Sequence, residues 1–154
     1  DFHSRHNAVM REYRYYIHVS PVPVPHFRLY SLRVQRRLDL TLLNGYARTI
    51  VGTHDFTSFT APNDPSPNRI RFMESAAFFP EGSYIVFRIT GNAFLWKMVR
   101  CLVGTMIELA KDQQPIEKMR EILRVRDRAA AGNTAAAKGL FLHKVVYDEQ
   151  SRSF

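Results

Sequence analysis

The segment REYRYYIHVS, residues 11–20, combines aromatic rings with positive charges in one short run. A ring such as that of Tyr13 can stack on a planar base, and the guanidinium groups of Arg11 and Arg14 can pair with phosphate oxygens. Aromatic residues on a strand more commonly pack into a core, and Tyr13 could pack with Tyr15 in that way. The segment therefore predicts either one wall of a nucleic-acid site or an ordinary core strand.

A second candidate is Arg100, which lies within an apolar stretch, residues 94–111. A guanidinium group can hold a carboxylate ionised and in a fixed orientation. Arg100 falls on a strip of polar or small residues at three- and four-residue spacing, which one side of a helix would present. That strip consists of Lys97, Arg100, Gly104, Glu108 and Lys111. The alternatives for Arg100 are an ion pair with Glu108 or a solvated surface charge.

The charge balance favours a polyanionic partner. The chain of 154 residues has 22 Lys and Arg against 14 Asp and Glu, a formal net charge of +8. Such an excess favours nucleic acid over an anionic membrane, although a basic surface without a partner is also compatible with it. Six arginines are candidates for phosphate contacts, namely Arg11, Arg14, Arg33, Arg36, Arg37 and Arg69.

Cysteine and apolar residues exclude several other classes. The single cysteine, Cys101, cannot form a disulfide within the chain and cannot provide a cysteine cluster for zinc. We predict no metal and no cofactor. No apolar run approaches the roughly 18 residues that a membrane-spanning helix needs, and no signal segment opens the chain, so we expect a cytoplasmic protein without a membrane partner.

Hydropathy patterns predict the elements that position these residues. Alternation over residues 11–19 predicts a strand with Tyr13, Tyr15, Ile17 and Val19 on one face. Apolar spacing predicts helices at 38–51, 94–111 and 115–124, with Gly52 as the C-terminal cap of the first. Strands are expected at 69–79 and 84–90, joined by a short turn, and at 140–147. Proline-rich segments at 20–25 and 61–68 are expected to be irregular.

This order of elements predicts one domain, residues 1–154, of the α+β class. We expect a ferredoxin-like, RRM-like sandwich in which helices pack on a mostly antiparallel sheet. Many RNA-binding domains use this architecture. The short aromatic RNP1 pattern typical of RNA-recognition modules is absent, which weakens a simple binding-module interpretation.

Five blocks of the sequence together resemble the C-terminal half of the bacterial tRNA pseudouridine synthase A family. The blocks are DFHSR at the start, REYRY at 11–15, GTHDFTSF at 52–59, GNAF with MVR at 91–100, and AKGLFL at 137–142. They occur in the order that the family shows and span nearly the whole chain. The resemblance implies the C-terminal half of the pseudouridine synthase fold.

The resemblance also implies an activity, the isomerisation of uridine to pseudouridine in the anticodon stem-loop of tRNA, without metal or cofactor. Tyr13 matches the tyrosine that stacks on the flipped base and is implicated in removing the proton from the carbon of the new glycosidic bond. Arg100 matches the arginine that pairs with the catalytic aspartate. Leu140 matches the leucine that packs on the base, and Gly139 permits close approach of the backbone.

Other residues of the matching blocks are expected to be structural. Asn92 is expected to cap the helix at 94–111 and Phe94 to anchor it. His54 and Asp55 suggest acid–base chemistry, but we expect Asp55 to accept hydrogen bonds from backbone groups of its loop. Where the family usually has a proline before Gly139, this chain has three alanines at 135–137. That departure concerns the rigidity of the loop rather than Leu140.

The family's catalytic aspartate lies in a Gly-Arg-Thr-Asp-Ala-Gly segment that does not occur in this sequence. We therefore expect a fragment whose full-length form is a tRNA-modifying homodimer, the dimer being implied by the family alone. The main alternative is a non-catalytic RNA-binding module. A protein-interaction domain with an incidental basic surface is a third, weaker alternative.

Overall fold

The computed structural model of the protein describes residues 8–148. The strands are β1 (Ala8–Val19), β2 (Leu32–Val34), β3 (Gly52–Asp55), β4 (Ile70–Glu81), β5 (Tyr84–Gly91) and β6 (Leu140–Tyr147). The helices are α1 (Leu40–Thr49), α2 (Met98–Lys111) and α3 (Ile116–Val125). Short 3-10 helices are η1 (Pro25–Phe27), η2 (Thr57–Phe59), η3 (Arg128–Ala130) and η4 (Ala137–Gly139).

The four long strands lie side by side in the order β6-β1-β5-β4, with every neighbouring pair antiparallel. Helix α1 connects β1 to β4, and helices α2 and α3 connect β5 to β6. This is the split β-α-β arrangement of ferredoxin-like folds, so the predicted α+β class is confirmed. Two short strands extend it, β3 along β4 and β2 parallel to the end of β1.

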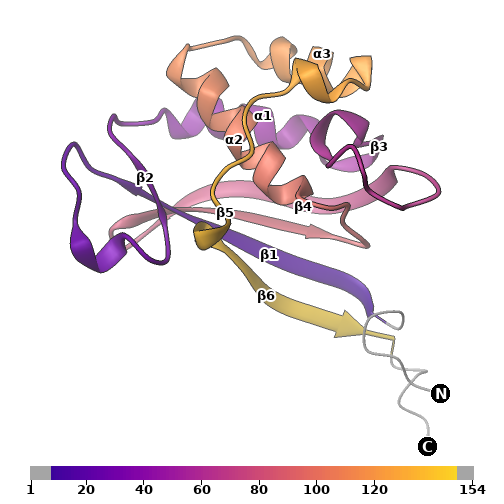
Figure 1. The fold of residues 1–154 in the computed structure, drawn as a ribbon, viewed down its shortest axis with the longest axis horizontal. Coiled ribbons are helices and arrows are strands. Elements are labelled where there is room, and N and C mark those ends of the chain that lie inside the picture. Colours follow the sequence, from indigo (N-terminus) through magenta and orange to yellow (C-terminus); the bar gives the residue numbers. More distant parts are fainter. Residues whose placement is uncertain (1–7, 149–154) are drawn as a thin grey trace, which may run out of the picture.

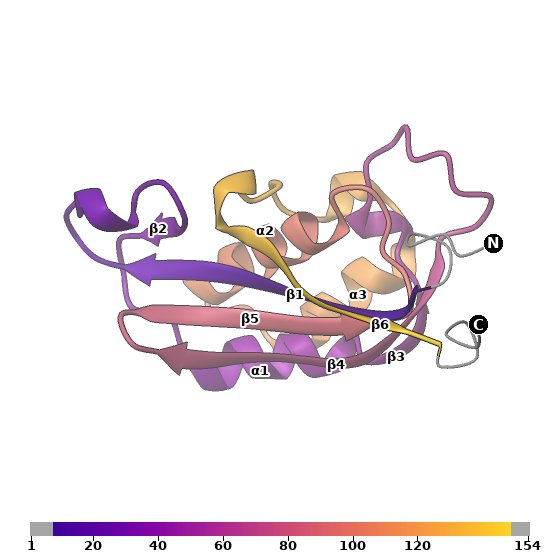
Figure 2. The same ribbon diagram turned by 90° about the horizontal axis from the view of Figure 1, so that it is seen from below.

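Helices α1, α2 and α3 lie on one face of the sheet, and within residues 8–148 no α-helix covers the other face (Figures 1 and 2). We call the second surface the open face. The core lies between helices and sheet, where Tyr15 and Ile17 of β1 meet Phe87 and Ile89 of β5 and the apolar side of α2. The predicted alternation along β1 is confirmed, because Tyr13, Tyr15, Ile17 and Val19 all belong to this core or pack against it.

Strand β6 shares one edge of β1 with β2. Strand β6 pairs with β1 as far as Tyr15 opposite Leu140, and β2 starts two residues later with Ile17 opposite Leu32. The edge of β1 therefore changes partner at Tyr16. The bounds of β6, Leu140–Tyr147, are those predicted from the sequence.

Several predicted boundaries were wrong. Helix α2 begins at Met98 rather than at residue 94, because Lys97 adopts a left-handed conformation with φ 58° that ends the preceding loop. Helix α1 begins at Leu40, where the Asp39 carboxylate accepts a hydrogen bond from the Leu42 amide and caps the first turn. Its C-terminal cap is Ile50, and Gly52, with φ 99°, starts β3 instead.

Strands β2 and β3 were not predicted from the sequence. They are three and four residues long, shorter than the runs in which alternation can be recognised. Strand β1 also begins earlier than predicted, at Ala8. The DFHSR block falls on residues 1–5 and lies outside the described residues.

Within residues 8–148, no helix is both long enough and apolar enough to cross a membrane.

Candidate functional site

Tyr13 lies on the helix-covered face of β1, near the strand's N-terminal half. Its ring is half-buried and meets the ring of Phe94 edge to face, with centroids 4.9 Å apart. Its neighbours in the sheet are Ile89 of β5 and Leu142 of β6. Tyr13 thus packs against the edge of the core, as the core alternative predicted, and part of its ring remains open to solvent.

The loop at 92–97 holds Phe94 against Tyr13. The expected cap of α2 by Asn92 was wrong, since the N-cap position is Lys97 and the Asn92 side chain instead accepts a hydrogen bond from the Phe72 amide at 3.0 Å. Phe94 packs against the core, as expected of an anchor. Asp64, a buried carboxylate, fixes the loop by accepting a hydrogen bond from the Trp96 amide at 2.6 Å.

Arg100 points from α2 toward the chain segment that leads from α3 to β6. Its Nε donates to the Ala135 carbonyl at 2.8 Å, and the Ala135 amide donates to the Arg100 carbonyl at 3.0 Å. Glu108 does not pair with it, because that carboxylate accepts a hydrogen bond from the Asn133 amide. In residues 8–148 no carboxylate lies within 4.0 Å of the Arg100 guanidinium.

The segment that connects α3 to β6 therefore crosses α2 along the polar strip of that helix. A Cβ atom on Gly104 would lie 1.8 Å from the Asn133 carbonyl oxygen, so the backbone crosses the helix at the one position without a side chain. The Thr105 hydroxyl accepts a hydrogen bond from the Gly132 amide beside it. The segment is held against α2 before it enters η4 and β6.

Tyr15 binds the C-terminal end of this connecting segment. Its side chain is fully buried, and its hydroxyl donates to the Ala136 carbonyl at 2.7 Å. Burial raises the pKa of the Tyr15 hydroxyl to about 12, against the opposing effect of the positive charge of Arg100. Successive carbonyls, Ala135 and Ala136, therefore tie Arg100 on the helix and Tyr15 on the sheet to one loop.

Gly139 and Leu140 follow directly from that loop. A Cβ atom on Gly139 would lie 2.8 Å from two carbons of the Tyr15 ring and 3.0 Å from the Tyr16 carbonyl oxygen. The close approach is to the protein's own strand, and the role of Gly139 beside a bound base stays a prediction. Leu140 pairs with Tyr15 across the two strands and is half-buried against the core.

The structure brings Arg100, Gly139 and Leu140 to Tyr15, and Tyr13 lies two residues along β1 on the same face. Arg11, two residues from Tyr13 along a regular strand, shares its face and donates to the Asn92 carbonyl at 3.0 Å. Arg14 does not join them. It lies on the open face, where its Nε pairs with Glu12 at 3.1 Å and its guanidinium lies 5.8 Å from the centre of the Phe79 ring.

The other candidate arginines are dispersed. Arg36 and Arg37 are exposed between β2 and α1, and Arg69 is half-buried beside the 61–68 loop. Arg33 lies opposite His18 on β2 and donates to the carbonyls of Ser20 and Pro21. The predicted set of phosphate contacts therefore does not form one surface.

Asp55 has the structural role that was expected. Its carboxylate accepts hydrogen bonds from the Thr57 amide, at 2.9 Å, and from the Thr57 hydroxyl. Burial alone would raise the pKa of Asp55, but these hydrogen bonds and the charges of Arg126 and Arg69 hold it below its usual value. Within residues 8–148, His54 forms no hydrogen bond with a carboxylate. Its Nε2 lies 2.8 Å from the Val51 carbonyl oxygen.

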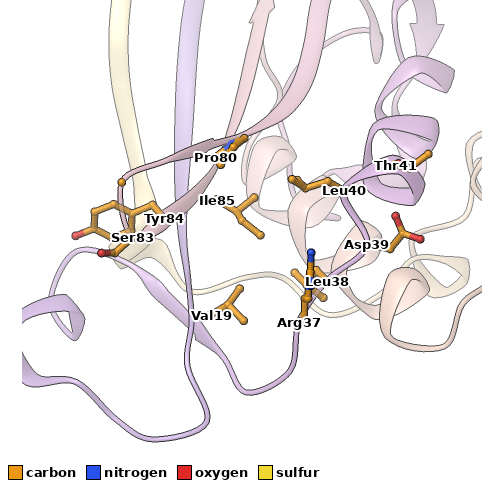
Figure 3. A pocket seen from close by; sticks show the side chains of 11 residues that line it. Val19, Arg37, Leu38, Asp39, Leu40, Thr41, Pro80, Ser83, Tyr84 and Ile85 are labelled. Carbon is orange, nitrogen blue, oxygen red and sulfur yellow. The ribbon is translucent and has the colours of Figure 1, made fainter.

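A cavity of about 670 Å³ lies away from this cluster, between the start of α1 and the turn joining β4 to β5. Val19, Leu40 and Ile85 form apolar walls, and Arg37 and Asp39 lie at its margin (Figure 3). Of the candidate residues, Arg37 lines it, whereas Tyr13, Arg100, Gly139 and Leu140 do not. Within residues 8–148, no three His, Cys, Asp or Glu side chains come together in a way that could hold a metal ion.

Comparison with known proteins matches residues 46–148 to a sequence family described as tRNA pseudouridine synthase. Three curated relatives carry the name tRNA pseudouridine synthase A. The protein of Borreliella afzelii is 40% identical over 147 residues, 96% of this chain and 60% of its own length. That of Brachyspira hyodysenteriae is 37% identical, covering 97% and 60%. That of Streptococcus equi subsp. zooepidemicus is 34% identical, covering 97% and 61%. The chain thus spans about three fifths of these relatives.

Proposed function

The chain belongs to the tRNA pseudouridine synthase family, and on that premise we propose that it forms the C-terminal part of an enzyme that isomerises uridine in the anticodon stem-loop of tRNA. The observation that carries the proposal is that one loop ties Arg100 to Tyr15, that Leu140 pairs with Tyr15, and that Tyr13 lies on the same face of β1. The net charge of +8 suits a polyanionic substrate. No observation favours the non-catalytic RNA-binding module.

The reaction breaks the bond between N1 of uracil and C1′ of ribose, turns the base, and joins C5 to C1′. The proton on C5 leaves to solvent and N1 gains one, so the reaction needs no oxidant or reductant. The base must be turned out of the RNA stack to reach the site. Tyr13 presents a partly exposed ring, fixed from behind by Phe94, on which a flipped base can stack.

Arg100 would orient the catalytic aspartate, which residues outside this chain would supply. Its Nε is occupied by Ala135, which fixes the plane of the guanidinium group and leaves the two terminal nitrogens for a carboxylate. Leu140 would pack on the base edge. Arg11 would contact the RNA backbone from the same face as Tyr13, whereas Arg14, on the open face, is the weakest of the proposed contacts.

The test is release of tritium from tRNA labelled at uracil C5 by the full-length protein. Wild-type protein should release tritium and the Tyr13→Phe variant should not. The control variant Tyr147→Phe, on the neighbouring strand β6, should retain activity. Failure of the wild-type protein to release tritium from tRNA that it binds would overturn the proposal.

The full-length enzyme would act on tRNA in the cytoplasm as a homodimer. The open face supports association, because its rings of Tyr16, Tyr84 and Phe141 surround a hollow of about 400 Å³ with no helix over it. Light scattering of the full-length protein should give the mass of a dimer, and Phe141→Glu should lower it toward that of a monomer. Ile70→Glu, at an exposed position near β3, is the control, and a wild-type monomer at working concentration would contradict the dimer.

A further inference from the structure

A second cavity lies on the open face, near the edge of β1 along which pairing changes from β6 to β2. It has a volume of about 210 Å³ and is bounded by the 23–33 segment on one side and by Lys138 of η4 on the other. In Figure 1 the loop that leads into β2 and the turn that leads into β6 lie along the same edge of β1. Lys138 directly precedes Gly139 and Leu140 in the chain, whereas His18 lines the cavity from the open face of β1, where its ring also meets Tyr84.

The charged side chains that line this cavity are all basic. Arg28, Arg33 and Lys138 line it together with His18, and no acidic residue does. Within the described part of the chain, none of the three cations lies within 4.0 Å of a carboxylate. A hollow lined by cations without an internal counter-ion attracts an anion from outside.

The cavity is also built before any ligand arrives. Arg33 donates to the carbonyls of Ser20 and Pro21, at 3.2 and 3.3 Å, which ties the proline-rich segment to β2. The Ser31 hydroxyl donates to the Phe27 carbonyl at 2.6 Å. The Phe27 ring in turn stacks on buried His18 with centroids 4.1 Å apart. A rigid wall of this kind lowers the entropy cost of binding.

Two of the cations are free to reach a ligand. Arg28 and Lys138 are exposed, and neither takes part in a hydrogen bond seen within residues 8–148, whereas Arg33 is engaged with the backbone. The opposite wall consists of Pro23, Val24 and Pro25, which suits the apolar edge of a sugar or base. The combination matches a nucleotide unit of an RNA strand better than a small inorganic anion.

We propose that this cavity binds a phosphodiester group of the tRNA on which the enzyme acts, with Arg28 and Lys138 as its cationic contacts. The inference rests on the proposed function, because it takes the substrate RNA as the ligand. Its effect is on binding and not on chemistry.

The test compares the full-length double variant Arg28→Gln/Lys138→Gln with Arg48→Gln/Lys111→Gln, which removes the same charge from exposed positions on α1 and α2. Affinity for tRNA is measured over a range of salt concentration. The cavity variant should bind more weakly and its slope of log K against log salt should shrink by about 1, while the control keeps the wild-type slope. In the tritium assay the cavity variant should show a raised KM with kcat unchanged.

The two proposals fail differently. If wild-type protein binds tRNA but releases no tritium, the enzyme proposal fails, and the salt slopes still decide whether the cavity contacts RNA. If tritium is released and the cavity variant has the salt slope and KM of the control, the cavity proposal is overturned. Titration with inorganic phosphate tests whether the ligand is instead a free anion. If wild-type protein binds phosphate saturably, the cavity variant does not, and the salt slope of tRNA binding is the same in both, the site takes the free anion and the cavity proposal is overturned as well.

Discussion

The backbone of Gly139 lies against the buried ring of Tyr15, so close that a Cβ atom there would be 2.8 Å from Cε1 and Cζ. The ring cannot retreat, because its side chain has no exposed surface and its hydroxyl is bound to the Ala136 carbonyl. The start of β6 therefore takes its position from Tyr15. Leu140 and Lys138, on either side of Gly139, are placed by the same contact.

Gly139→Ala should lower the free energy of unfolding by about 1–3 kcal/mol, the usual cost of forcing an extra carbon into a packed interior. The reason is the Tyr15 ring, so the effect should depend on that ring. In a Tyr15→Leu background, the same Gly139→Ala change should cost clearly less. Urea unfolding of the four proteins measures the coupling, and equal costs in both backgrounds would contradict the contact.

Gly104→Ala should destabilise the protein although an Ala usually favours a helix over Gly by about 1 kcal/mol. The added Cβ would meet the backbone carbonyl of Asn133 at 1.8 Å, and backbone cannot turn aside as a side chain can. Gly45→Ala is the matched control in α1, where the Cβ meets only the end of the Ile116 side chain. Thermal unfolding should show the larger loss at Gly104, and a stabilised Gly104→Ala protein would refute the crossing.

Asp64→Asn should cost about 1–3 kcal/mol of stability at neutral pH, because one amide side chain cannot accept from both the Trp96 and the Ser66 amides. Burial alone would raise the pKa of Asp64, but hydrogen bonds from Ser66 and Trp96 and the charge of Arg69 hold it below its usual value. A carboxylate whose pKa is lowered by folding stabilises the folded state at pH values above its unfolded pKa of about 3.9. That stabilisation is lost as the pH falls through the folded-state pKa. The gap between wild type and variant should narrow below about pH 4 in urea titrations, and a constant gap would contradict the assignment.

Tyr15 should make the protein sensitive to alkali. Because burial raises the pKa of its hydroxyl to about 12, its contribution to stability is complete below the unfolded pKa of about 10 and is lost as pH rises toward 12. The stability difference between wild type and Tyr15→Phe should therefore fall across that interval. Unfolding free energies at several pH values measure it, and an unchanged difference would mean that the hydroxyl is not shielded from water.

The sequence was informative where contacts are local and uninformative where they are not. Alternation along β1 and β6 is a property of neighbouring residues. It gave the bounds of β6 and the C-terminal end of β1, although β1 begins three residues earlier than predicted. The start of α2 was misplaced because residues 94–97 continue the apolar spacing of a helix while packing as a loop. The ties from Ala135 to Arg100 and from Ala136 to Tyr15 join residues 35 and 121 positions apart, and no local pattern announces them.

The cluster at Tyr13 shows the same division. Its members were named by resemblance, but Phe94 was assigned only an anchoring role, and its contact with Tyr13 required the fold. The cations of the second cavity were found only in part, since Arg33 was a candidate whereas Arg28 and Lys138 were not. Exposed single cations carry no signal until the chain brings them to one hollow.

Arg100→Lys separates the charge of Arg100 from its geometry. A lysine keeps the positive charge but cannot both donate to the Ala135 carbonyl and present a two-pronged face to a carboxylate. We expect tritium release by the full-length protein to fall by about 100-fold or more in kcat, the scale seen when a preorganised electrostatic contact is lost. Affinity for tRNA should change little, because the net charge is the same. Lys97→Arg, an exposed substitution just before α2, is the control and should leave the rate intact. If Arg100→Lys retained the wild-type kcat, a charge alone would suffice, and the orientation imposed by Ala135 would have no part in the reaction.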